Sequence, residues 1–344
     1  MVSSTVPAGP ASGRVPVYLP GPVRAEAGVP VRRAQLAVLA AHLTARDQWL
    51  LAMVHEHKVL TSAQIHALAF GGARTMRKRL VLLTAGLRVL DRFRPLISLG
   101  TAPEHYVLGP AGAAWLAAAQ GVNLKAFGYH RHRAHQIAAS RQLAHTVGTN
   151  AFFTALAAGG RMDPASGQLA AWWSEKRCLR LWSDLARPDG YGHYTHAAPG
   201  ADPATARHVR FFLEYDTGTE ALTRLPAKLP GYARLAAATG RAGLVLFYLP
   251  SATREENLHA LFARERAPVP VATTSPDALT VARCGPAGPV WRPVNARPRH
   301  RAAERVPLID LDALAAQTAV RRSADQQAAR PSWWTEPPPP LPPP

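Results

Sequence analysis

The sequence predicts a mixed α+β protein, in which an N-terminal winged helix-turn-helix precedes a domain built on an α/β sheet. Between residues 44 and 108, helical periodicity and glycine turns give three short helices followed by two strands. Between residues 165 and 296, strand patterns alternate with helical ones, which is typical of a sheet covered by helices. The excess of basic over acidic residues indicates the kind of binding partner rather than the fold.

Composition limits the classes of function. The chain has 344 residues, enough for two domains, and 47% hydrophobic residues, enough for a sizeable core. Its formal charge of +18 and its pI near 11.0 indicate a polyanionic partner, nucleic acid before membrane. Part of the arginine excess can also reflect a GC-rich genome, because Ala, Pro and Gly are abundant as well.

The expected location follows from the cysteines and the apolar runs. Cys178 and Cys284 stand far apart, which excludes a disulfide scaffold and fits a reducing cytosol. No apolar run is long enough to span a membrane, and residues 1–30 lack the pattern of a secretory signal. We therefore expect a cytoplasmic protein without a membrane partner.

The predicted first domain covers residues 31–120, after a leader, residues 1–30, that is rich in Pro, Gly and Ala and is expected to be disordered. Apolar residues then recur at helical spacing, and Thr44 is placed to cap the helix that contains Trp49. Thr61 or Ser62 caps a second, short helix.

A glycine turn at Gly71-Gly72 precedes a third helix, predicted over Ala73–Ala85. Two strands follow, Leu87–Phe93 and His105–Leu108. Three short helices and a hairpin in this order are typical of a winged helix-turn-helix, whose third helix enters the major groove.

Basic residues concentrate on this third helix and the strand after it. Seven cations face one anion, Asp91, over residues 71–94. The candidates for contact with double-stranded DNA are Arg74, Arg77, Lys78, Arg79, Arg88, Arg92 and Arg94. The alternative is a solvated basic helix in a protein–protein module.

A connector over residues 121–164 links the two predicted domains. His130, His132 and His135 stand among arginines, whose charge opposes a metal cation, so contact with phosphate is favoured. A single long helix is predicted over Ala134–Ala158.

The second domain is predicted over residues 165–296, as alternating strands and helices. The expected strands are Ala170–Ser174, Tyr191–Thr195, Val209–Asp216, Gly243–Leu249, Val269–Thr274 and Val290–Val294. The second and third of these form a hairpin, and the continuous apolar run of the fourth indicates burial on both faces. After the third strand, Thr217 or Thr219 is expected to cap a helix that carries Glu220 and Lys228.

Glu214 and Asp216 end the third of these strands at positions i and i+2, and so project from the same face. Two carboxylates in this arrangement can share one divalent cation through oxygen ligands. The alternative is an amphipathic strand whose polar face is merely solvated.

The last segment, residues 297–344, is basic and then helical at about Leu308–Arg322. It ends in Pro337–Pro344, a polyproline tail expected to stay extended without packing. A role for the tail as a peptide ligand is left open.

Several motifs resemble the replication-relaxation family of actinobacterial plasmids and mobile elements. They are AWWSE at Ala171–Glu175, RPDG at Arg187–Gly190, and FFLEYDTGTE from Phe211 with Lys228 and Tyr232 downstream. The resemblance spans about residues 42–250 and implies a DNA-associated protein needed for plasmid replication or DNA relaxation, with replication or transfer proteins as further partners.

The second half also resembles a degenerate restriction-endonuclease core of the PD-(D/E)xK type. The resemblance implies that Pro188-Asp189 opens one strand, that Glu214 supplies the acid of the next and that Glu175 is the upstream acid. Asp216 departs from the pattern, because a Lys is expected there, and Lys228 can fill that role. Asp189, Glu214 and Asp216 would then hold Mg²⁺ or Mn²⁺, which activates water, and Lys228 would neutralise charge on the phosphate.

Three classes of function stay open. The chain is a DNA-binding factor without chemistry, a metal-dependent endonuclease addressed by its winged helix, or an inactive nuclease fold used for protein docking. No Gly-rich nucleotide loop is present, which disfavours an ATP-driven motor. His193 and His196 lie near two tyrosines but lack the third histidine of a relaxase-like triad.

Overall fold

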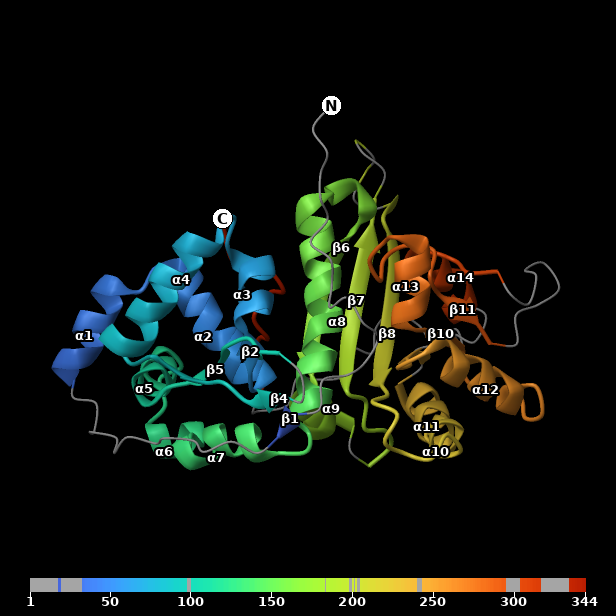
Figure 1. The fold of residues 1–344 in the computed structure, drawn as a ribbon, viewed down its shortest axis with the longest axis horizontal. Coiled ribbons are helices and arrows are strands. Elements are labelled where there is room, and N and C mark those ends of the chain that lie inside the picture. Colours follow the sequence, from blue (N-terminus) through green and yellow to red (C-terminus); the bar gives the residue numbers. More distant parts are fainter. Residues whose placement is uncertain are drawn as a thin grey trace.

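A computed structural model describes residues 18–19, 33–97, 100–182, 184–197, 200, 202, 205–239, 243–294, 304–316 and 334–344. It has a mixed α+β fold that contains a six-stranded mixed sheet. In Figure 1 a helical unit lies beside a larger unit built on this sheet, and the long helix α8 (Leu143–Met162) stands between them.

The helical unit begins with four helices whose starts follow from the local sequence. They are α1 (Arg33–His42), α2 (Ala45–His57), α3 (Ser62–Ala69) and α4 (Ala73–Val81), which continues as a π-helical turn over Leu82–Gly86. Thr44 and Thr61 form capping boxes with Asp47 and Gln64, as their positions before the apolar runs predicted. Gly72 is the N-cap of α4 and has extended backbone.

A three-stranded antiparallel sheet completes this unit. Its order is β2 (Leu60–Thr61), β5 (His105–Leu108), β3 (Leu90–Phe93), so the predicted hairpin is present. Strand β2 was not predicted, because two residues are too few for a pattern. Strand β1 (Tyr18–Leu19) belongs to the predicted leader and pairs with β4 (Leu96–Ile97), while most of the leader lies outside the described residues.

The connector contains a break that the sequence analysis missed. Instead of one helix over Ala134–Ala158, the chain forms short helices and only then α8. The short helices of the connector are α6 (Leu124–Phe127), α7 (Arg131–Gln136) and a 3₁₀ turn (Ile137–Ala139). Helix α5 (Pro110–Ala119) lies before the connector. Ser140 has extended backbone, and its hydroxyl accepts a hydrogen bond from the backbone N of Gln142, which ends the helix locally.

The large sheet has the order β11-β10-β9-β8-β7-β6. Its strands are β6 (Gln168–Ser174), β7 (Gly190–His196), β8 (Arg207–Tyr215), β9 (Leu244–Tyr248), β10 (Val271–Thr274) and β11 (Arg292–Pro293). The pairs β6–β7, β7–β8 and β10–β11 are antiparallel, and β8, β9 and β10 are parallel. The described residues beyond Val294 give a 3₁₀ turn (Leu308–Leu311) and α14 (Asp312–Ala316).

Helices follow the strands on both sides of the sheet (Figure 1). They are α9 (Glu175–Trp182), α10 (Arg224–Ala227), α11 (Leu229–Thr239), α12 (Ala252–Phe262) and α13 (Pro276–Ala282). The predicted helix from Thr217 or Thr219 through Lys228 is wrong. The two threonine hydroxyls meet each other at 3.0 Å, and the prolines at 226 and 230, which lack a backbone N–H, split the segment into two helices.

Successive side chains of β8 point to opposite faces of the sheet. Phe211 stacks on Phe153 of α8, with ring centroids 6.0 Å apart. Phe212 lies on the other face against Tyr232 of α11, at 5.1 Å. Strand β9 is buried on both faces, as its continuous apolar run predicted.

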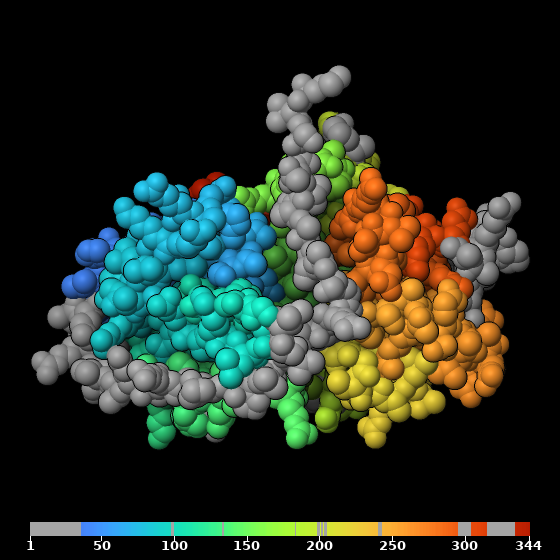
Figure 2. All heavy atoms as spheres, in the orientation of Figure 1, coloured from blue at the N-terminus to red at the C-terminus, as the bar shows by residue number. Residues whose placement is uncertain are grey.

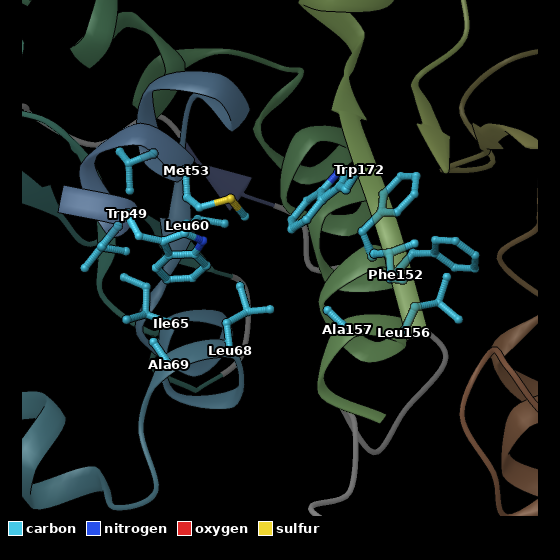
Figure 3. Packing of buried hydrophobic residues seen from close by; sticks show 14 of the residues in the cluster. Trp49, Met53, Leu60, Ile65, Leu68, Ala69, Phe152, Leu156, Ala157 and Trp172 are labelled. Carbon is cyan, nitrogen blue, oxygen red and sulfur yellow. The ribbon is translucent and has the colours of Figure 1, made fainter. Parts of the chain in front are cut away.

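The core is continuous across the two units. Buried side chains of the helical unit, including Trp49, Met53 and Ile65, belong to one cluster with Phe152 and Trp172 (Figure 3). The division into domains at residues 120 and 165 stays a prediction.

Helix α8 approaches the sheet very closely. A Cβ at Gly148 would lie 2.4 Å from the ring of Tyr215, so a larger residue there would require that ring to move. Gly148 is one of the small residues that allow this close packing, together with Gly160 of α8 and Gly190 of β7.

A buried ion pair attaches α4 to α2. The side chain of Asp47 is 1% exposed and accepts hydrogen bonds from the Nε and Nη2 of Arg79, which also donates to the carbonyl of His42 at 2.8 Å. Burial opposes the charge of Asp47, but the hydrogen bonds from Arg79 and Thr44 lower its pKa.

Arg79→Ala should lower the free energy of unfolding by about 3 kcal/mol, because it leaves the buried charge of Asp47 without its cation. Arg74→Ala, an exposed neighbour on the same helix, serves as the control and should change it by less than about 0.5 kcal/mol. Urea denaturation measures both, and equal effects of the two variants would contradict a structural role for Arg79.

Candidate functional site

A polar pocket opens at the end of β8, beside the start of β7. It encloses about 330 Å³. All five residues that the sequence analysis nominated for catalysis line it: Glu175, Asp189, Glu214, Asp216 and Lys228. Side chains up to 53 positions apart in the sequence thus reach one place, although their contacts differ.

Glu214 is the most buried acid of the pocket, with 1% exposure. It projects toward α10 and α11, where the Nζ of Lys228 donates to its Oε2 at 2.6 Å and the hydroxyl of Tyr232 donates to its Oε1. Burial and the neighbouring charge of Asp189 raise the pKa of Glu214 to about 7, even though Lys228 and Tyr232 act in the opposite direction. Glu214 can therefore exchange a proton near neutral pH.

Asp189 immediately precedes β7, the strand that pairs with the Glu214-bearing strand β8. Its Oδ2 accepts a hydrogen bond from the backbone N of Tyr215 at 2.8 Å and lies 3.0 Å from the Nε2 of His145 on α8. Burial opposes the charge on His145, but the hydrogen bond to Asp189 and its charge outweigh this and raise the pKa of His145.

Lys228 lies at the junction of α10 and α11. Burial disfavours its charge, but the carboxylates of Glu214 and Asp189 overcome this effect and raise its pKa. The side chain is 39% exposed, so the ammonium is held by Glu214 and also reaches the open pocket.

Glu175 is the first residue of α9 and connects the pocket to the helical unit. Its Oε2 accepts a hydrogen bond from the Nζ of Lys58, which follows α2, at 2.8 Å. It stands on the pocket wall as the resemblance implied, with a cation already beside it.

Asp216 lies beyond the last residue of β8 and has other partners. Arg254 of α12 binds both of its oxygens, and its Oδ1 accepts from the backbone N of Gly218 at 2.8 Å, in a turn where Gly218 has φ +79°. Glu214 and Asp216 are thus paired with separate cations, Lys228 and Arg254.

The carboxylates only partly fit a divalent cation. No group of three or more His, Cys, Asp or Glu arranged to hold a metal occurs among the described residues. Asp189 and Glu214 repel each other, as the raised pKa of Glu214 records, and a cation between them would relieve that repulsion. Both oxygens of Glu214 are engaged by Lys228 and Tyr232, and Asp216 is engaged by Arg254, so metal binding by the predicted trio stays a prediction.

Three residues that bind the acids of the pocket were not assigned a role from the sequence. His145 lies within the helix predicted over Ala134–Ala158, and its pairing with Asp189 depends on the packing of α8. Tyr232 follows Lys228 by four residues, a spacing that places both on one side of a helical segment and that could have suggested a shared partner. Arg254 comes from α12, which no local pattern connects to β8.

The predicted DNA-contacting residues fall into two groups. Arg74, Arg77 and Lys78 are exposed on α4, in the part of the helical unit that forms an open surface in blue to cyan (Figure 2). Arg79, on the same helix, is instead the partner of Asp47.

The remaining candidates lie around β3. Arg94 pairs with Glu104 at 2.8 Å and Arg92 approaches the same carboxylate at 3.8 Å. Arg88 is exposed with φ 54°. Asp91, the single anion of this stretch, binds Arg131 and His135 of the connector, so His135 has a carboxylate partner rather than an open position for phosphate.

Comparison with known proteins gave one match. The family model described as replication-relaxation matches residues 51–245. Neither the curated proteins nor the solved structures gave a match to the chain. No helix among the described residues is long and apolar enough to cross a membrane.

The raised pKa of Glu214 predicts a pH-dependent stability. Glu214 ionises at about 7 in the folded chain but near 4.5 when unfolded. The folded state therefore binds the extra proton between these values, and the free energy of unfolding should fall as the pH rises from 5 to 8, by on the order of 2 kcal/mol.

His145 contributes in the same direction, because its pKa is also raised and its favourable charge is lost as the pH rises. Glu214→Gln should remove the larger part of the slope and His145→Gln the smaller part. Chemical denaturation at several pH values measures the slopes. Glu265→Gln, an exposed acid after α12, is the control, and a slope in Glu214→Gln equal to that of the wild type would contradict the shift.

Proposed function

The chain belongs to the replication-relaxation family, and from this premise we propose that it binds double-stranded DNA during the replication or relaxation of a plasmid or mobile element. The observation that carries the proposal is the exposed row of Arg74, Arg77 and Lys78 on α4. The formal charge of +18 supports a polyanionic partner in general, and the exposed row supports α4 as the contacting element.

The surroundings of α4 support its use as a reading helix. Helices α2, α3 and α4 with the sheet β2-β5-β3 have the order of elements expected of a winged helix-turn-helix, in which the third helix enters the major groove. Arg79 and Asp47 hold α4 from its inner side. The three outward cations are thereby presented on a rigid element, which favours a defined register on the duplex.

Arg92 and Arg94 have a different part in this proposal. They flank the hairpin and share Glu104, so their charge is already partly compensated. We assign them to weaker phosphate contacts beside those of α4, and we assign Arg79 to the fold alone.

We also propose a second activity, metal-dependent cleavage of a phosphodiester bond in the pocket. The observation that favours it is the meeting of Asp189, Glu214 and Lys228, which matches the residues implied by the PD-(D/E)xK resemblance. Mg²⁺ or Mn²⁺, when bound, would polarise the phosphate and lower the pKa of a bound water. Asp189 and Glu214 would hold the ion, and Glu175, which also lines the pocket, would be a further ligand.

The other residues of the pocket have clear tasks in this scheme. Lys228 sits where it can leave Glu214 and neutralise charge that builds on the phosphate. Tyr232 orients the carboxylate of Glu214, and His145 orients that of Asp189. Asp216 is paired with Arg254, which leaves Asp216 outside the set of ligands.

Replacement of Arg74, Arg77 and Lys78 together by Ala should weaken DNA binding and flatten its salt dependence. Each lost phosphate contact lowers the magnitude of the slope of log K against log salt by about 0.9. Mobility-shift or anisotropy titrations at several salt concentrations measure the slope.

The control removes the same charge elsewhere. Arg264, Arg266 and Arg283 are exposed after α12 and α13, away from α4 in the sequence. Their replacement by Ala should leave the slope near that of the wild type. Equal losses in the two triple variants would mean that charge alone, and not α4, governs binding.

Mg²⁺ or Mn²⁺ should raise the melting temperature of the wild type, because a ligand that binds only the folded site stabilises it by mass action. Glu214→Gln should abolish the rise, whereas Glu265→Gln should keep it. Lys228→Ala should retain the rise but reduce nicking of supercoiled DNA by about 100-fold or more. A wild type that shows neither a metal-dependent shift nor nicking would leave the DNA-binding function without this chemistry.

A further inference from the structure

The C-terminal tail packs on the protein, contrary to the expectation that its prolines would keep it free. The indole Nε1 of Trp49 on α2 donates to the carbonyl of Pro339 at 2.7 Å. Pro340 is buried, and Leu341 packs against the main core cluster. Figure 1 marks the C-terminus over the helical unit, although the tail follows the sheet unit in sequence.

A second anchor lies at the start of the tail. The Nη1 of Arg177 on α9 donates to the carbonyl of Thr335 at 2.8 Å, and its guanidinium stands 5.1 Å from the ring centroid of Trp334. The same ring meets Trp173 of β6 in an edge-to-face contact, with centroids 5.4 Å apart. The tail thus spans from the sheet unit to α2 of the helical unit.

An ion pair on the receiving side holds Arg177 in position. Arg177 is 7% exposed and donates from its Nε and Nη2 to the two oxygens of Glu56, each at 2.8 Å. Burial opposes the charge of Glu56, yet the hydrogen bonds from Arg177 lower its pKa to about 2. This ion pair orients Nη1, the remaining nitrogen of the Arg177 guanidinium, toward the tail.

The chemistry of the contacts is that of polyproline recognition. Prolines fix φ and have no N–H, so an extended proline-rich segment offers carbonyl acceptors and ring faces but few donors. The protein supplies what such a segment lacks, an indole N–H and a guanidinium N–H, together with aromatic surfaces. Aromatic-lined grooves with these donors select extended proline-rich ligands.

We propose that this face, formed by α2, β6 and α9, is a binding site for a proline-rich segment with a tryptophan upstream, and that the chain's own tail is its resident ligand. The tail occupies the site intramolecularly, and a segment of similar sequence from another protein displaces it. The site takes a partner independently of DNA and of the pocket chemistry.

The test keeps the whole chain. A protease site placed within residues 317–333, between α14 and the tail, allows the linker to be cut after folding. A fluorescent peptide of residues 334–344 should then bind saturably to the cut chain. It should bind at least about 10-fold more weakly to the uncut chain, because a tethered tail competes at an effective concentration of about 1 mM.

Two variants locate the contact. Trp49→Phe keeps the ring but removes the N–H that Pro339 accepts, and should weaken peptide binding by about 3- to 10-fold. Trp334→Ala in the peptide removes the contacts to Arg177 and Trp173 without touching the fold, and should weaken binding at least as much. A peptide with alanines in place of Pro337–Pro340 should fail to compete.

Two outcomes overturn the proposal. In one, the cut tail stays bound and excess peptide never exchanges with it, so the segment is a permanent part of the core. In the other, the tail dissociates and the peptide does not bind, or binds equally well after Trp49→Phe. Neither outcome bears on DNA binding by α4.

Discussion

The close approach of α8 to β8 is the constraint on which the pocket depends. Gly148 leaves no side chain where the ring of Tyr215 passes, and this lets the helix settle on the sheet. His145, one turn earlier on α8, then reaches Asp189, while the backbone N of Tyr215 binds the same carboxylate. The close packing of α8 on the sheet thus brings the histidine on α8 to the aspartate before β7.

The sequence predicted local elements well, where the cause of each element is itself local. The caps at Thr44 and Thr61, the hairpin of β7 and β8, and the doubly buried β9 all follow from patterns of a few residues. The break at Ser140 and the split around the prolines at 226 and 230 were missed because helical spacing was given more weight than local hydrogen bonding and proline sterics.

The sequence predicted which residues lie at the candidate site, but not which side chains form ion pairs with one another. Glu214, Asp189 and Lys228 were found from a motif and lie in one pocket, since a motif reports which residues occur together. The expectation that Asp216 shares a ligand with Glu214 considered only strand alternation, and could not include Arg254, which arrives from α12. In the same way, Arg79 looked like its neighbours on α4 until its tertiary partner, Asp47, was known. Tertiary ion pairs therefore decide which charges are available to a ligand.

Strand β6 ends the sheet, and an end strand presents unpaired backbone groups to other chains. In this fold α2 lies at β6: His57 stacks on Trp172 with ring centroids 3.8 Å apart, and Glu56 accepts a hydrogen bond from the hydroxyl of Ser174. Helix α2 precedes β6 in the sequence by more than 100 positions, so a ribosome completes the helix first. Helix α2 is therefore synthesised before the edge strand against which it packs.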